Sequence, residues 1–98
     1  MLKANLIESS ENELKIEIKG VNRSLLHLLQ KTLLQNEKVE IAGYDVPHPL
    51  LGSAILYIKT KGHEKPTQAV MDASEKLKEG AREFEKTFKK ALKEYSKG

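Results

Sequence analysis

Residues suited to catalysis or metal binding are few and widely separated in this chain of 98 residues. There is no cysteine, so disulfides and thiolate-ligated metals are excluded. The histidines are His27, His48 and His63, and none stands at the short spacing of a local metal-binding motif. The sequence also has no glycine-rich phosphate loop and no nucleophile elbow. We therefore expect no catalytic residues, no metal and no cofactor.

The chain has a formal net charge of +3, and its positive charge is concentrated in the second half. Five lysines lie near the C-terminus, where the helix dipole favours cations: Lys86, Lys89, Lys90, Lys93 and Lys97. Carboxylates alternate with basic residues along the same segment, which favours a solvated helix face over a nucleic-acid surface. No long apolar run or signal-peptide pattern occurs, so we expect a cytoplasmic protein with no membrane contact.

Four segments have the patterns of β-strands. Leu2–Ile7 and Leu14–Lys19 flank a turn-like stretch and predict a hairpin. Val39–Val46 and Ala54–Thr60 predict two more strands, and the unbroken apolar run of the last one suits a strand covered on both faces. A turn is expected between them, over residues 47–52, because it contains two prolines.

The first helix is predicted over Leu25–Leu34, with Ser24 as its N-cap residue. Its six leucines spread over roughly 240° of the helical wheel, whereas covering one sheet needs an apolar stripe of only about 100°. This helix therefore has two apolar faces to bury. We expect Leu25, Leu29 and Leu33 to pack on the sheet and Leu28 or Leu34 to face a neighbouring protein chain. The alternative is that the C-terminal helix covers the second face within the same chain.

The last third of the chain, Pro66–Tyr95, is predicted to be one uninterrupted amphipathic helix. Proline is favoured at a first helical position, and the apolar residues of this segment share an arc of roughly 140°. Such a helix would be roughly 45 Å long, more than the roughly 33 Å diameter of a compact domain of this size. Its apolar stripe would then extend beyond its own domain, which is typical of an assembly subunit.

The element order is strand, strand, helix, strand, strand, helix. This order predicts an α+β fold in two layers, with a mostly antiparallel four-stranded sheet and two helices, the C-terminal one long. Residues 1–98 are expected to form a single domain.

Residues between positions 44 and 66 resemble the archaeal DNA-directed RNA polymerase subunit L family and the similar eleventh-subunit family of eukaryotic polymerases. The residues that carry the resemblance are Tyr44, His48, Pro49, Thr60, Gly62 and Pro66. The family usually begins its first helix with an acidic residue, histidine and threonine, where this chain has Asn22, Arg23 and Ser24.

The resemblance implies a non-catalytic assembly subunit of RNA polymerase, active in transcription as part of a nucleotidyltransferase complex. It implies a heterodimer with the polymerase's D subunit, similar to the bacterial alpha homodimer, that supports the large catalytic subunits and joins other small subunits. Contact with DNA would be indirect, and no small-molecule substrate is implied. The expected dimer interface consists of Leu25, Leu26, Leu28, Leu29, Leu33, Val70, Ala73, Leu77, Gly80, Phe84, Phe88 and Leu92. Gly80 within this set suggests a close helix crossing.

Two other functions remain open from the residues alone. One is a small enzyme on a two-layer fold similar to that of pterin dehydratases, which would use histidines. The other is a basic nucleic-acid-binding module that would use the C-terminal lysines.

Overall fold

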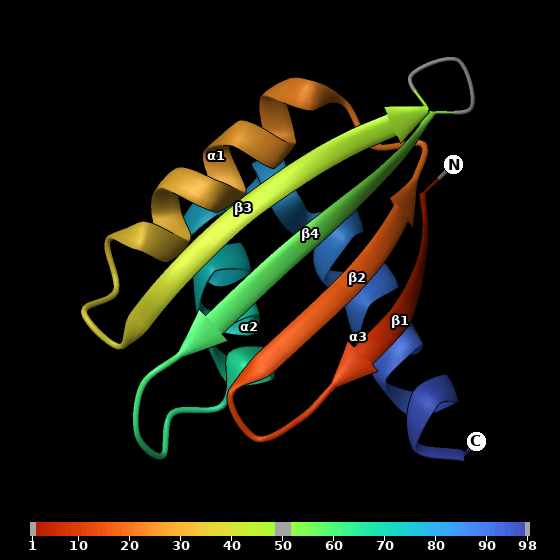
Figure 1. Cartoon of the computed structure of the whole chain (residues 1–98). Helices are drawn as coiled ribbons and strands as arrows, with labels where there is room; N and C mark the ends of the chain where they lie inside the picture. Colours follow the sequence, from red (N-terminus) through yellow and green to blue (C-terminus); the bar gives the residue numbers. More distant parts are fainter. Residues whose placement is uncertain (1, 49–51, 98) are drawn as a thin grey trace.

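Two β-hairpins form one antiparallel sheet in a computed structural model that describes residues 2–48 and 52–97. The strands are β1 (Lys3–Ser9), β2 (Glu13–Lys19), β3 (Val39–His48) and β4 (Ser53–Thr60). Their order across the sheet is β1-β2-β4-β3, so the two hairpins join through β2 and β4 (Figure 1). Helix α1 (Arg23–Leu34) connects the hairpins, and the helices after β4 complete a second layer on the same side of the sheet.

The inner face of the sheet is apolar because every second residue of the central strands points to the helices. Leu14, Ile16 and Ile18 of β2 stand opposite Ile58, Leu56 and Ala54 of β4, and all six are at most 2% exposed. The predicted alternation of residues 14–19 is therefore confirmed.

The outer face of the sheet is open, which corrects the expectation that β4 is covered on both faces. Ile55 and Tyr57 of β4 are only partly buried, and they pair with the charged residues Glu17 and Lys15 of β2. All helices lie behind the sheet in Figure 1. The apolar run of β4 thus has two environments, one in the core and one beside solvated charges.

The two strand boundaries at the far hairpin also differ from the prediction. Strand β3 continues to His48, which pairs with Ser53, so Pro47 belongs to a strand and not to a turn. Proline is tolerated there because β3 is an edge strand. Residues 49–51 of the expected turn, Pro49 among them, lie outside the described residues, whereas Gly52 is described and has a positive φ of 67°.

Helix α1 is capped two residues earlier than expected, because Asn22 is the N-cap residue. The Asn22 side-chain Oδ1 accepts a hydrogen bond from the backbone N–H of Leu25 at 2.8 Å. Ser24 lies inside the helix, so its assignment as the cap was wrong. Both residue types are good caps, and the chain has an extended backbone at Asn22, with φ −87° and ψ 151°.

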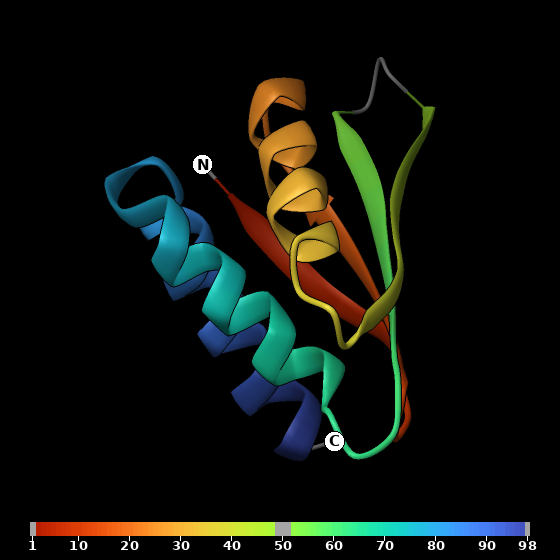
Figure 2. The same ribbon diagram turned by 90° about the vertical axis from the view of Figure 1, so that its left-hand side faces the viewer.

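The C-terminal third is helical over the expected length but is not one helix. Helix α2 (Pro66–Leu77) ends at a short 3₁₀ segment, η2 (Lys78–Ala81), and α3 (Arg82–Lys97) then runs back beside the sheet (Figure 2). The expected rod of roughly 45 Å is therefore wrong for this structure, whose principal dimensions are 37 × 30 × 25 Å. The fold-back occurs because α3 covers the part of the inner face that α1 and α2 leave open.

The predicted fold class is confirmed by this architecture. It is an α+β domain with two layers, an antiparallel four-stranded sheet and a long C-terminal helical region. The difference lies in the path of that region and not in the layers that it helps to form.

Candidate dimerisation surface

Helix α1 presents leucines in two directions, as its all-round apolar pattern predicts. Leu26, Leu29 and Leu33 are at most 1% exposed and belong to the core. Leu28 is 47% exposed and Leu34 is 51% exposed, on a helix packed against β3 and α2. Leu28 and Leu34 are therefore exposed apolar side chains of α1, about 120° apart around its axis, and we call the exposed side of the helix that carries them the α1 face.

The buried side of α1 differs in one residue from the prediction. Leu26 packs fully in the core, whereas Leu25, expected on the sheet, is only partly buried. Helix α2 does pack against α1 within the chain, but it leaves Leu28 and Leu34 exposed. The alternative that the C-terminal helices cover the second face of α1 thus holds only in part.

Much of the predicted interface lies in the core of this chain. Phe84 and Phe88 are both 0% exposed, and their rings are stacked with centroids 6.0 Å apart and an interplanar angle of 9°. They share one hydrophobic cluster with other predicted interface residues, namely Leu26, Leu29, Leu33, Val70 and Ala73. The partly buried members at the edge of this cluster are Leu25, Leu77 and Leu92. The structure therefore brings most of the predicted residues together, but around an internal core.

Gly80 lies at the exposed corner between α2 and α3. A Cβ atom built on Gly80 would meet no atom within 4 Å, so no close crossing involves it inside this chain. The residue with the unusual backbone is Lys78, with φ 53° and ψ −127°. A close crossing at Gly80 with another chain stays a prediction.

Two exposed apolar residues at the sheet were not among the predicted interface residues. Ile7 is 46% exposed beside a bulge in β1, and Ile41 is 44% exposed on the edge strand β3. Sequence reasoning placed both in strands but had no signal for which strand edges or faces stay open. Ile41 pairs with Lys59 on the outer face of the sheet.

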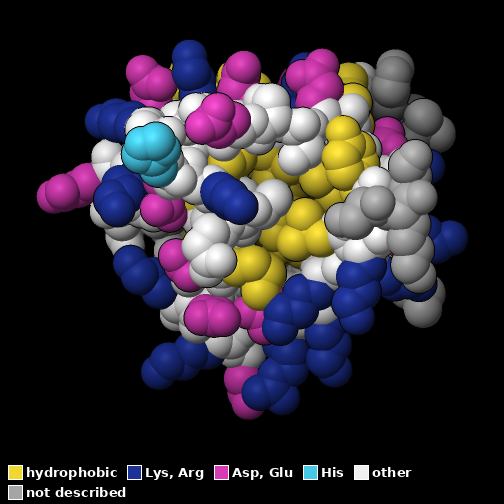
Figure 3. Space-filling view, turned by 90° about the horizontal axis from the view of Figure 1, so that it is seen from below, with side chains coloured by type: hydrophobic (Ala, Val, Ile, Leu, Met, Phe, Trp, Pro, Cys, Tyr) yellow, Lys and Arg dark blue, Asp and Glu magenta, His cyan; other side chains and the backbone are white. Residues whose placement is uncertain are grey.

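The core is incompletely sealed at the end of the molecule where α3 finishes. Figure 3 shows hydrophobic side chains gathered there between the sheet and the helices, with lysine and arginine side chains beside them. Tyr95, near the end of α3, is 46% exposed. This end therefore offers further apolar surface close to positive charge.

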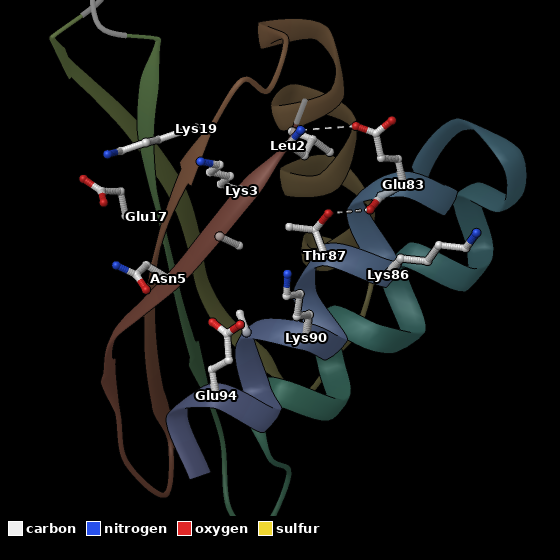
Figure 4. A pocket seen from close by; sticks show the side chains of 12 residues that line it. Leu2, Lys3, Asn5, Glu17, Lys19, Glu83, Lys86, Thr87, Lys90 and Glu94 are labelled. Atoms are coloured by element: carbon white, nitrogen blue, oxygen red, sulfur yellow. Dashed lines mark hydrogen bonds between the residues drawn. The ribbon is translucent and has the colours of Figure 1, made fainter. Parts of the chain in front are cut away.

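A groove of about 860 Å³ separates β1 from α3 (Figure 4). Its lining is strongly charged and includes Lys3 and Lys19 from the strands and Lys86, Lys90 and Glu94 from α3 (Figure 4). The backbone N–H of Leu2 donates a hydrogen bond of 3.3 Å to Glu83 Oε1 across the upper part of the groove. The mixed charges match no defined ligand chemistry.

The residues that carried the family resemblance hold the entry into α2. The Asn12 side chain donates hydrogen bonds to Thr60 Oγ1 and to the Gly62 carbonyl, and the Thr60 hydroxyl donates to the Glu64 carbonyl. Gly62 adopts a positive φ of 58°, where glycine is favoured. Pro66 is buried at the start of α2, as predicted. Among these residues, the geometry indicates a structural role.

The remaining motif residues lie on or beyond β3. Tyr44 is partly buried against the core, and His48 is the last residue of the strand. Pro49 lies outside the described residues.

The histidines and carboxylates do not form a chemical site in the described part of the chain. His27 and His63 are exposed and come from different elements. Within residues 2–48 and 52–97, no three His, Asp or Glu side chains gather closely enough to hold a metal ion. None of the helices described is long and apolar enough to cross a membrane.

Tyr57 on the outer face of the sheet has a shifted pKa. Its hydroxyl donates a hydrogen bond to Glu13 Oε1, and chiefly this bond raises the pKa of Tyr57 above its ordinary value of 10.0. The nearby negative charges of Glu8 and Glu40 act in the same direction. Tyr57 is therefore neutral at physiological pH and serves as a hydrogen-bond donor in a cross-strand pair.

Comparison with known proteins gives these surfaces their context. The family described as the RNA polymerase Rpb3/Rpb11 dimerisation domain matches residues 13–87. The chain therefore belongs to this family of polymerase dimerisation domains.

Relatives of this chain occur among archaeal polymerase subunits. DNA-directed RNA polymerase subunit Rpo11 of Methanosarcina barkeri is 34% identical over 91 residues, which cover 93% of this chain and 98% of the relative. The Rpo11 subunit of Archaeoglobus fulgidus is 40% identical over 76 residues, covering 78% of this chain and 87% of the relative. Rpo11 is the subunit that is also called L, so the resemblance stated from the motif residues is confirmed.

The fold agrees with a solved structure of such a subunit. The crystal structure of DNA-directed RNA polymerase subunit L from Thermoplasma acidophilum superimposes with a TM-score of 0.72 over 99% of this chain and 95% of that chain, at 24% identity. The relatives are components of a polymerase complex and not catalytic subunits, which argues against the alternative of a small stand-alone enzyme.

Proposed function

We propose that this chain is an assembly subunit of an archaeal-type RNA polymerase that pairs with the polymerase's D subunit through the α1 face and the C-terminal helices. The heterodimer would then support the large catalytic subunits and receive the other small subunits. Membership of a dimerisation-domain family supports this proposal. Contact with DNA would come only through the assembled enzyme, in the cytoplasm.

The observation that carries the proposal is the exposure of Leu28 and Leu34 on a helix whose other leucines are buried or partly buried. Each of these two side chains keeps about half of its surface in water in the free chain. Burying a leucine fully is worth about 1.5–3 kcal/mol, so pairing through this face would recover free energy that folding alone leaves unused. The neighbouring α2 provides a second helix along the same layer.

The basic residues of α3 do not require a different function. Lys86, Lys89, Lys90 and Lys93 lie along this helix, and Lys89 Nζ lies 4.0 Å from Glu85 Oε1, as the four-residue spacing predicts. A row of lysines interrupted by carboxylates suits a solvated helix face. A nucleic-acid role for these lysines stays a hypothesis.

The pairing is tested with Leu28→Asp and its matched control Ile41→Asp. Both side chains are apolar and similarly exposed, at 47% and 44%, so neither change should unfold the chain. We expect sedimentation of each variant mixed with the D subunit to show a 1:1 complex for Ile41→Asp and a complex weakened at least about tenfold for Leu28→Asp. Equal binding by the two variants would contradict the assignment of the α1 face.

Substitutions at Leu29 or Phe84, which the sequence alone makes attractive, would not discriminate in this way. Both side chains are 0% exposed in the core. A buried aspartate there would unfold the chain and abolish pairing for a trivial reason.

A further inference from the structure

The corner between α2 and α3 has an unfavourable backbone conformation at Lys78, which is not a glycine. Lys78, with φ 53° and ψ −127°, is the one non-glycine residue with positive φ in the described part of the chain. This geometry belongs to the first central position of a type II′ turn, which glycine normally occupies. Gly80 follows two residues later, where φ is not positive. If this corner were a permanent turn, we would expect glycine at position 78.

The sequence through the corner is instead suited to a continuous helix. Lys78, Glu79 and Ala81 are good helix formers. At 100° per residue, the core-facing side chains on the two sides of the corner fall within an arc of about 80°. They are Val70, Ala73, Leu77, Ala81, Phe84 and Phe88. One apolar stripe therefore runs through a corner that the backbone breaks.

Open space borders part of helix α3. The groove of about 860 Å³ lies between α3 and β1, and a second gap of about 520 Å³ follows near the end of α3, lined by Asn5, Ala91, Glu94 and Tyr95. Asn5 of β1 and Glu94 of α3 both line the first groove, and Figure 4 labels both side chains. The stacked rings of Phe84 and Phe88 hold the first half of α3 on the core, whereas its second half borders open space.

We propose that Lys78–Ala81 is a hinge, and that pairing with the second polymerase subunit releases α3 from β1 and joins α2 and α3 into one helix. This inference rests on the proposed function. The free chain would keep α3 folded back as a cover for its own apolar surface. The open form would relieve the backbone of Lys78 and add the hydrogen bonds of a continuous helix, at the cost of exposing Phe84 and Phe88.

A partner with an apolar helix face would decide between the two forms. It can shift the equilibrium only because it binds the open form more strongly than the closed form. The joined helix, residues 66–97, would be about 48 Å long. It would project beyond the body of the molecule, whose longest dimension is 37 Å in the closed form.

The hinge can be followed by a distance between spin labels at positions 5 and 94. The chain has no native cysteine, so Asn5→Cys with Glu94→Cys gives a uniquely labelled protein. Both residues line the same groove, so the free chain should show a short distance. In the open helix, Glu94 stands about 20 Å beyond Ala81. We expect the distance to lengthen by about 10 Å or more when the D subunit binds.

The outcomes separate the hinge from the proposed function. A 1:1 complex with a lengthened distance supports both. A 1:1 complex in which the distance stays short overturns the hinge and leaves the pairing intact. Absence of any complex would contradict the proposed function and, with it, the hinge.

A matched pair of variants tests the hinge without labels. Lys78→Gly and Lys76→Gly both remove one lysine charge and both weaken a continuous helix equally. Only Lys78→Gly also relieves the closed form, since Lys76 already has a helical backbone in α2. We expect Lys78→Gly to bind the D subunit about three- to tenfold more weakly than Lys76→Gly. Equal affinities would overturn the hinge.

Discussion

At the residue scale, single polar side chains decide where the elements of this fold begin. Asn22 holds the start of α1 through one hydrogen bond from the Leu25 N–H. Asn12 and Thr60 hold the corner that leads into α2. These contacts replace hydrogen bonds that the ends of helices and strands leave unmade.

The cap of α1 gives a direct prediction for stability. Asn22→Ala should lower the free energy of unfolding by about 1 kcal/mol, because the Leu25 N–H loses its acceptor. Ser24→Ala should change it by no more than a few tenths of a kcal/mol, because Ser24 lies inside the helix and alanine is a better helix former. Urea denaturation of the two variants measures both values. A larger loss for Ser24→Ala would restore serine as the cap.

At the element scale, α3 contributes to the core through a few large side chains. Phe84 and Phe88 are fully buried against a cluster that includes strands β2 and β4 and helices α1 and α2. The same helix carries lysines along its exposed side. The stability of the closed form therefore depends on the aromatic pair far more than on the end of the helix.

Replacing one ring should show this division. Phe88→Ala should lower the free energy of unfolding by about 3–5 kcal/mol, because it removes a fully buried ring and leaves a cavity. Tyr95→Ala, at a side chain that is 46% exposed, should lower it by less than about 1 kcal/mol. Thermal unfolding of both variants compares them. Similar losses for the two would mean that α3 is not held by its aromatic pair.

At the scale of the whole molecule, the fold-back of α3 makes the free chain compact. The Cα radius of gyration is 12.3 Å, which matches the roughly 13 Å of a compact domain of about 100 residues. The layers cover one face of the sheet and leave the other to solvent (Figure 2). The exposed apolar side chains are spread over the α1 face, the outer face of the sheet, the bulge of β1 and the end of α3.

Small-angle scattering of the dilute free chain tests this shape. We expect a radius of gyration near that of a compact monomer, because Phe84 and Phe88 are buried in the closed form. A projecting helix of about 48 Å would increase the radius and the maximum dimension together. Finding that larger shape at every dilution would show that the free chain is open without a partner.

The sequence by itself determined the strands, the fold class and the family. The strict alternation at residues 14–19 has a period of 2 and predicts a strand. The leucine pattern of α1 fits a period of 3.6 residues and predicts a helix. The wheel also predicted a second apolar face of α1 with Leu28 or Leu34 on it, because six leucines spread over about 240° exceed what one sheet covers; the exposure of both came from the structure. The motif that includes Thr60, Gly62 and Pro66 by itself indicates the polymerase family.

Where the sequence allows two local structures, only the tertiary structure decided which of them forms. Asn22 and Ser24 are both good caps, and the path of the chain into α1 selected Asn22. The apolar run of β4 fits a strand covered on one face or on both, and the placement of every helix behind the sheet left Ile55 and Tyr57 on the open face. Residues 66–97 have the pattern of one long helix, yet the uncovered core beside β1 draws α3 back and breaks the backbone at Lys78. Local patterns could not predict this break, because the free energy of burying Phe84 and Phe88 comes from strands distant in the sequence.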